Sequence, residues 1–160
     1  MKNFKKLLLI ALAVVSFAAC GDDNDEDEKK TPETSTSSFT GTVAVGDFSL
    51  SDVKVQTTCK NKEKTCSITM YQVTFSSQMP MRMDITMSDV PFTVSGSDTL
   101  ISGSNVTTTY TLNGNTGNFS DVGYSIPSMS GTISKGKLTL STSVGSSHGD
   151  MTMTYEGNRD

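Results

Sequence analysis

Apolar and polar residues alternate along several segments in the second half of the chain. Leu138, Leu140 and Val144 share one parity, and serine or threonine fills the positions between them. The segments 106–112 and 151–156 alternate in the same way. A period of two places successive side chains on opposite faces of a strand. The pattern therefore predicts β-strands with one apolar face and one hydroxyl-rich face.

Turn-forming sequences separate the alternating segments. They combine glycine with Asn, Asp, Ser or Lys, and glycine and asparagine tolerate the backbone conformations of tight turns. They are Val45–Asp47, Val94–Ser97, Asn113–Asn115, Ser134–Gly136 and Gly145–Ser147. Their spacing favours an antiparallel meander, in which each strand pairs with the next along the chain.

The apolar parity changes at two points, which indicates irregular strands. It switches between 68–70 and 73–75, so the sequence predicts a β-bulge near Tyr71. A second switch falls within 87–90 and is followed by Pro91. Because proline has no amide hydrogen to donate to a sheet, this second point predicts an edge, a kink or another bulge.

Composition places the segment 38–160 in the all-β class. After Ser38 the only alanine is Ala44 and leucine is sparse, whereas Ser, Thr, Val, Ile, Phe, Tyr and Met dominate. A sheet with one apolar face can close on itself, and the sequence predicts an antiparallel up-and-down barrel of about eight strands. The interior of such a barrel either fills with side chains or holds one small ligand. A β-sandwich is the alternative fold.

The first residues have the order of a secretory signal. Lysines at positions 2, 5 and 6 precede the apolar run 7–17, which is shorter than the roughly 20 residues needed to span a bilayer. Ala18 and Ala19 then precede Cys20. This order resembles the lipobox of bacterial lipoproteins, with Phe17 where leucine is usual. The resemblance implies that residues 1–19 are removed and that Cys20 is acylated. The alternative is an ordinary signal peptide with an incidental cysteine.

An acidic linker follows Cys20. Residues 22–28 hold six carboxylates and no apolar side chain, and residues 31–38 are rich in Pro, Ser and Thr. Such a composition cannot bury a core, so the segment 20–37 is predicted to be an extended tether before the domain 38–160. The acidic run resembles the surface-export signal of Bacteroidetes lipoproteins, which implies an outer-membrane protein at the cell surface. The alternatives are a mere spacer and a location on the periplasmic face.

The remaining charges are nearly balanced. Outside the signal and the linker the chain carries 10 acidic and 8 basic residues, so no broad basic face is expected. Nucleic acid is therefore not an expected partner.

Two cysteines remain besides Cys20. Cys59 and Cys66 bracket the sequence KNKEKT and have strand-like residues on both sides. A tight turn at 61–64 would place them opposite each other across a hairpin, close enough for a disulfide. An exported protein permits that bond. Metal binding is the alternative, although zinc prefers four ligands and no further Cys or His lies nearby in the sequence.

Methionine is concentrated in the stretch QMPMRMDITM. Met79, Met81, Met83, Ile85 and Met87 recur at a period of two, so in a strand they would share one face. Met151 and Met153 form a second stripe near the C-terminus, and both stripes are expected to face the barrel interior. Methionine is flexible and polarisable, so these residues either fill the core or line a plastic pocket. A third reading is a Cu(I) site made of thioethers with His148.

The pocket reading defines the candidate ligand-binding residues. The ligand would be a small lipid-like or steroid-like apolar molecule. The candidates are Met70, Met81, Met83, Met87, Met151, Met153 and Tyr155.

Several stretches together resemble the calycin-like β-barrel domain of Bacteroidetes lipoproteins. They are FTGTVAV near the start, the central TTTYTLNGN, and MSGTISKGKLTLSTSV followed by MTMTYEGNR. The resemblance covers nearly all of residues 39–160 and implies an up-and-down, lipocalin-like barrel. That family has no established activity, so it implies no functional residue and no cofactor. Lipocalins carry Gly-x-Trp near the first strand, and this chain has no tryptophan.

Catalytic motifs are absent from the sequence. The single histidine is His148, and the chain contains no Gly-x-Ser-x-Gly, no His-Glu-x-x-His and no P-loop. We therefore expect neither an enzyme nor a cofactor. Asp98-Thr99-Leu100 resembles the acceptor sequence of Bacteroidetes O-glycosylation at Thr99, and a plain turn is the alternative.

Two classes of function follow from the sequence. One is a tethered barrel that binds a small apolar ligand. The other is a filled barrel whose surface contacts a partner in the envelope or on a host. The presence or absence of an interior cavity separates the two.

Overall fold

The computed structural model describes residues 33–76, 81–147 and 149–160. The predictions for residues 1–32, including acylation of Cys20 and the acidic linker, lie outside the described residues. The same holds for Met79 and His148.

Ten strands and one short helix make up the described chain. They are β1 (Thr34–Val45), β2 (Phe48–Lys60), β3 (Thr65–Val73), β4 (Met83–Ser95), β5 (Asp98–Ser104), β6 (Thr108–Leu112), β7 (Asn115–Asn118), the 3-10 helix η1 (Phe119–Val122), β8 (Tyr124–Ser134), β9 (Lys137–Ser146) and β10 (Met151–Arg159). In the described residues no helix is both long enough and apolar enough to cross a membrane.

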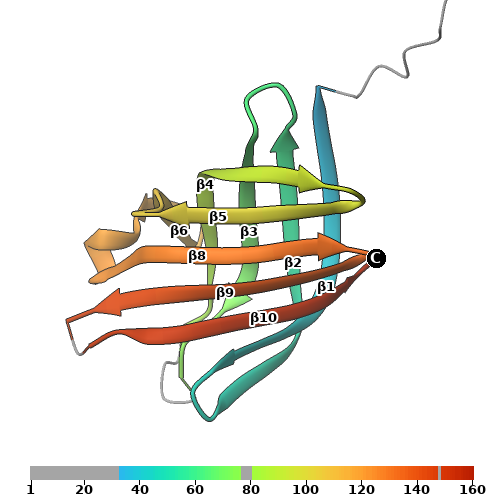
Figure 1. The fold of residues 1–160 in the computed structure, drawn as a ribbon. Coiled ribbons are helices and arrows are strands. Elements are labelled where there is room, and N and C mark those ends of the chain that lie inside the picture. The colour runs from blue at the N-terminus through green and yellow to red at the C-terminus, as the bar shows by residue number, and fades with distance from the viewer. Residues whose placement is uncertain (1–32, 77–80, 148) are drawn as a thin grey trace, which may run out of the picture. The chain divides into compact units, whose positions relative to one another are not determined.

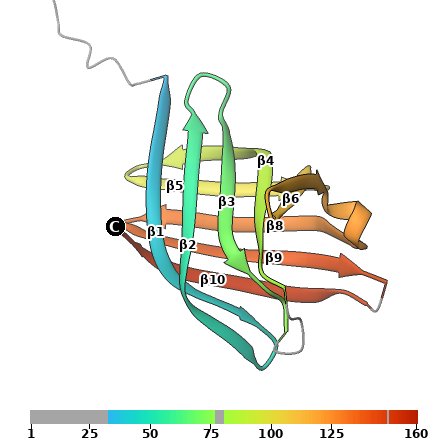
Figure 2. The same ribbon diagram turned by 180° about the vertical axis from the view of Figure 1, so that it is seen from behind.

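Eight of the strands close into a ring. The order is β3-β2-β1-β10-β9-β8-β5-β4, and pairing of β3 with β4 completes the circle. Every pairing is antiparallel. Figures 1 and 2 show that β1 to β3 run steeply across the direction of β8 to β10. The predicted all-β barrel of eight strands is confirmed.

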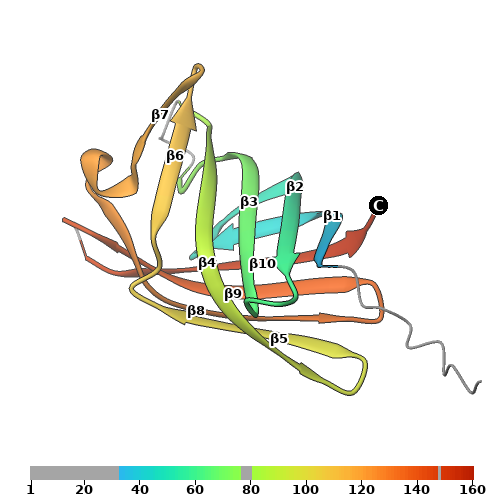
Figure 3. The ribbon, with the colours of Figure 1, turned by 90° about the horizontal axis from the view of Figure 1, so that it is seen from above.

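The β6–β7 hairpin lies outside this ring. β4 gives one edge to β3, and its other edge is shared between β6 at residues 84–87 and β5 at residues 92–95. Figure 3 shows the hairpin standing away from β5 and β8. It is an insertion between β5 and β8, which pair directly with each other.

The predicted turns lie at the strand ends. Asn113 and Gly114 have φ of 51° and 80°, and Lys135 and Gly136 have φ of 49° and 78°. Two successive residues with positive φ form the primed turns that match the twist of a β-hairpin. These turns fix the register of β6–β7 and of β8–β9.

Both predicted irregularities are also present. The pairing of β3 with β4 shifts between Met70 and Val73, where Gln72 has φ of 54°. The Asp84 carboxylate stabilises that bulge by accepting hydrogen bonds from the Gln72 backbone amide and side-chain amide, at 2.9 and 3.0 Å. The second shift faces Asp89, with φ of 52°, just before Pro91. Bulges of this kind bend strands, as barrel closure requires.

The first strand begins earlier than composition suggested. β1 starts at Thr34, and residues 34–37 pair with residues 57–60 of β2. The sequence placed these four residues in the linker because serine and threonine are common in both linkers and strands. Because their backbones pair with β2, residues 34–37 form part of a strand and not of the linker.

The inward faces of the strands form one continuous core. It contains aromatic, aliphatic and methionine side chains that are at most 8% exposed. The most completely buried large side chains include Phe39, Phe119, Ile68, Met70, Met83, Ile85, Met87, Leu138 and Met153. The alternation read from 138–144 is confirmed, because Leu138, Leu140 and Val144 are buried.

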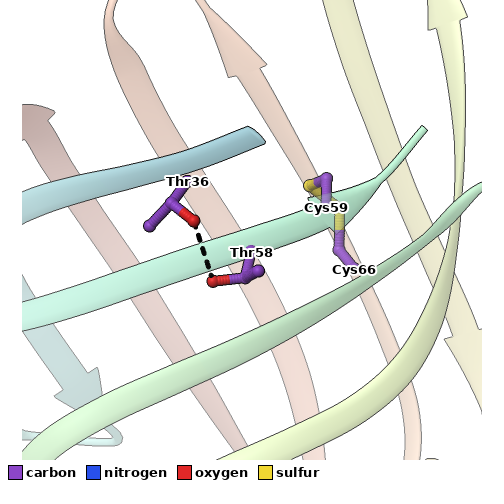
Figure 4. Close-up of a disulfide and its surroundings, with 4 residues drawn as sticks. All are labelled: Thr36, Thr58, Cys59 and Cys66. Atoms are coloured by element: carbon purple, nitrogen blue, oxygen red, sulfur yellow. Dashed lines mark hydrogen bonds between the residues drawn. A yellow bond between two sulfur atoms is a disulfide. The ribbon is translucent and has the colours of Figure 1, made fainter. Parts of the chain in front are cut away.

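Cys59 and Cys66 form a disulfide across the β2–β3 hairpin. They occupy opposite positions in the ladder, and both side chains are buried. Figure 4 shows the bond on the strand face opposite to the hydrogen-bonded pair Thr36 and Thr58. The predicted pairing is confirmed.

We predict that this disulfide stabilises the barrel modestly. Replacing both cysteines with alanine should lower the free energy of unfolding by about 2–3 kcal/mol, because the bond closes only a short loop in the unfolded chain. Urea titration measures the change. Dithiothreitol should destabilise the wild type by a similar amount and leave the double variant unaffected. Two free thiols in freshly isolated protein would contradict the bond.

Candidate functional site

The methionines of β4 point into the barrel. Met83, Ile85 and Met87 are 2%, 0% and 0% exposed, so the predicted period of two holds from Met83 onward. Met81 does not share this face, because it precedes the strand and is 48% exposed. The β3–β4 ladder begins with the pair Val73 and Met83, so no partner strand orients Met81.

The other candidate ligand-binding residues come from β3 and β10. Met70, Met153 and Tyr155 are 0%, 1% and 2% exposed. Met151 is partly buried and packs against the same cluster. The structure therefore brings together six of the seven candidates, with Met81 apart from them, and places the six in or against the packed core.

Tyr155 is the polar member of this group. Its hydroxyl donates a hydrogen bond of 3.4 Å to the backbone carbonyl of Val53 on β2. Burial of the ring, together with the nearby negative charge of Asp160, raises the pKa of Tyr155 to about 12. Both effects disfavour the phenolate, so Tyr155 acts here as a neutral hydrogen-bond donor.

A second interior hydroxyl has no partner. Thr142 on β9 is 1% exposed, and its Oγ1 atom makes no hydrogen bond within the described residues. Its neighbours in the ladder are Met153 and Met129. An unpaired buried hydroxyl costs about 1–3 kcal/mol, so this position is locally unfavourable.

Metal coordination finds no support within the parts of the chain that the structure describes. There, no group of three or more His, Cys, Asp or Glu side chains could hold a metal ion. The Cu(I) reading needed Met81 together with Met83, and these side chains lie in solvent and in the core respectively. Its third element, His148, lies outside the described residues.

Thr99 lies in a strand and not in a free turn. It is the second residue of β5, its side chain is partly buried, and it pairs with Val94 and Ile133. Modification of Thr99 stays a prediction, and the fold gives this hydroxyl less access than the sequence suggested.

A pocket of about 340 Å³ lies between the β5–β6 connection, η1 and the first residues of β8. Phe119 and Tyr124 line it, and their rings are stacked with centroids 5.4 Å apart. Phe75 packs on both rings, at 5.9 and 5.2 Å. No pattern in the sequence predicts this pocket, because it depends on how the β6–β7 insertion meets the ring.

Comparisons with known proteins bear on the fold. No protein-family model matches the chain, and no curated protein matches it either. One similar solved structure is that of a "putative outer membrane protein" from Bacteroides fragilis, with a TM-score of 0.51 and 20% sequence identity. The match covers 78% of this chain and 50% of that one, so this chain corresponds to about half of that protein's length. At this identity the similarity shows a shared fold, and membership of the calycin-like family stays a prediction.

We predict that alkaline pH reports on Tyr155. In the unfolded chain tyrosine ionises near pH 10, whereas the folded pKa is about 12. Below about pH 10 the group is neutral in both states and contributes nothing. Between the two pKa values only the unfolded chain ionises, so stability should fall by at most about 1.4 kcal/mol per pH unit.

Urea unfolding at increasing alkaline pH measures this loss. Tyr155→Phe should lose less stability over the same interval, and its ultraviolet titration should lack the latest phenolate transition. An identical pH dependence in the variant and the wild type would refute the assignment.

Proposed function

We propose that the protein is an outer-membrane lipoprotein that presents a packed β-barrel on an acidic tether. The order Phe17-Ala18-Ala19-Cys20 after an apolar run supports the anchor, and the acidic residues 22–28 support export to the cell surface. The similarity in fold to a "putative outer membrane protein" of Bacteroides fragilis is consistent with this location.

One observation carries the choice between the two functional classes. Met70, Met83, Met87 and Met153, which were candidates for lining a ligand pocket, belong to the continuous core. A barrel whose centre is occupied by its own side chains is better suited to a rigid interaction module than to an interior carrier. We propose that the module contacts other molecules through its ends and outer surface and catalyses no reaction.

We predict that replacing Cys20 with alanine abolishes anchoring. Without the thiol no acyl chain can be attached, so the variant should leave the membrane fraction and lose labelling by a fatty-acid probe. Cys59→Ala is the matched control, because it also removes one cysteine but leaves Cys20 in place. Unchanged labelling of the Cys20 variant would refute the lipoprotein proposal.

Deleting residues 22–28 tests the surface location separately. The shortened protein should still be acylated but should resist protease added to intact cells. If it is cleaved as readily as the full chain, the acidic run is only a spacer.

We predict that the methionines act as core and not as a ligand surface. Met83→Leu nearly conserves volume and should cost less than about 1.5 kcal/mol of stability. Met81→Leu, at an exposed position of the same stretch, should cost almost nothing. Urea titration gives both values. An apolar molecule found by native mass spectrometry in the wild type and lost in Met83→Leu would contradict a filled interior.

A further inference from the structure

The pocket of about 340 Å³ beside η1 has a buried floor and an exposed rim. Phe119 and Ile126 form part of its floor and belong to the packed core, since they are 1% and 2% exposed. Asn105, Asn118 and Ser125 lie at its rim and are exposed. A molecule in this pocket would therefore touch the outside of the barrel and not its interior.

Tyr124 forms an aromatic wall of this pocket. Its ring is partly buried and stacks on Phe119, with an angle of 26° between the two planes. Phe75 packs against both rings, so contacts with two neighbours fix the orientation of Tyr124. Tyr124 also lines a second pocket of about 330 Å³, whose other walls include Gly145 and Asp150. The two pockets therefore adjoin along Tyr124.

Two asparagines bring carboxamides to the rim from different parts of the chain. Asn118 ends β7, and Asn105 lies in the β5–β6 connection. The Asn105 backbone amide donates a hydrogen bond of 2.8 Å to the carbonyl of Pro127, and that of Val106 donates one of 2.9 Å to Ile126. Because these bonds hold the backbone in place, Asn105 can meet a ligand without the cost of ordering a loop.

The described residues that line this pocket carry no charge. Asp121 of η1 is not among them, and its carboxylate accepts a hydrogen bond of 3.0 Å from the Asn118 backbone amide. A charged ligand would lose hydration here without meeting an opposite charge, which is costly. Carboxamides, hydroxyls and an aromatic ring therefore favour a neutral ligand that carries hydroxyls.

A peptide strand finds no open backbone ladder on this side of the pocket. Extended peptides bind sheet edges through backbone hydrogen bonds. The β5–β6 connection and β8 already use theirs on each other, at Asn105 and Val106. Recognition is therefore left to side chains.

We propose that this outer pocket binds a neutral carbohydrate. One face of a sugar ring would lie on Tyr124, because the face of an aromatic ring is negative and attracts the weakly positive hydrogens of C–H groups. The sugar hydroxyls would exchange hydrogen bonds with the carboxamides of Asn105 and Asn118, each of which can donate and accept.

The size of the pocket fits one sugar ring. At about 30 Å³ per water-sized group, the volume of about 340 Å³ admits roughly eleven such groups, close to one hexose with its hydroxyls. The adjoining pocket has room for a second ring, whose hydroxyls would donate to Asp150.

This binding rests on the proposal that the barrel is an interaction module, and it names the chemical class of the partner. It depends neither on the membrane anchor nor on the surface location.

An array of immobilised neutral oligosaccharides of glucose, galactose, mannose and N-acetylglucosamine tests the proposal. The chain from Gly21 onward is used, which retains the linker and the whole barrel. Sialylated and sulfated glycans on the same array are the charged comparison, and they should bind more weakly. In solution, saturation-transfer nuclear magnetic resonance with the tightest neutral binder should show the strongest transfer to C–H protons on one face of a sugar ring.

One pair of variants tests the carboxamide contact. Asn105→Gly removes the carboxamide and tolerates the backbone φ of 49° at this position. It should weaken glycan binding several-fold, as expected for the loss of a neutral hydrogen bond. Asn113→Gly is the matched control, because Asn113 has a φ of 51° and lines neither pocket.

A second pair tests the aromatic contact. Tyr124→Leu keeps an apolar side chain but removes the ring, and it should weaken binding about three- to tenfold. Tyr71→Leu is the matched control, since Tyr71 is an exposed tyrosine of β3 that lines neither pocket. If Tyr124→Leu fails to fold, the asparagine pair still gives the answer.

Several results would overturn the proposal. They are no binding to any neutral glycan, tighter binding to the charged glycans, and equal weakening by a variant and its matched control. In each case the module and its anchor stay open to their own tests, which are native mass spectrometry and fatty-acid labelling. If Met83→Leu, at a core position, weakens binding as much as Tyr124→Leu does, the ligand lies in the interior, and the interaction-module proposal fails as well.

Discussion

Closure of the ring between the first and last strands is the constraint on which the rest of the structure depends. β1 and β10 pair from Phe39 to Val45, and the backbones approach closely where Gly41 faces Gly157. A Cβ atom on Gly41 would collide with the β10 backbone, and one on Gly157 would collide with the Tyr155 ring. Glycine at 41 therefore allows the two backbones to approach, and glycine at 157 leaves room for the Tyr155 ring, whose hydroxyl reaches the Val53 carbonyl on β2. One side chain thereby ties three neighbouring strands together at the seam.

Closure also decides what the interior can hold. A ring of about eight strands is only wide enough for its own side chains or one small ligand. Here methionines from β3, β4 and β10 meet phenylalanine and branched aliphatic side chains in a single cluster. Methionine adapts to irregular gaps, so it suits a core assembled from strands that cross at steep angles. The unpaired hydroxyl of Thr142 shows that this packing is not ideal everywhere.

Local features of the fold could be predicted from the sequence, and non-local ones could not. The turn at 113–114, the bulge near Gln72 and the pairing of Cys59 with Cys66 each depend on a few neighbouring residues. β6 pairs with the part of the β4 edge that β5 leaves unpaired. No short-range pattern in the sequence encodes this pairing. The same limit applies to function, since the spacing of the methionines is visible in the sequence but the burial of each side chain is not.

The pocket lined by Ser35 and Ser37 at one end of the barrel shows how a pattern can be present in the sequence and still be missed. On β1 the inward positions run from Phe39 to Ser37 and Ser35, so the alternation continues while its inward members become polar. Read alone, that change resembles the end of a strand and the beginning of a linker. With the β1–β2 register known, the same residues are inward-facing and line the rim of a pocket. A hydroxyl-rich stretch that keeps the period of a neighbouring strand is therefore better interpreted as the polar end of a barrel than as a linker.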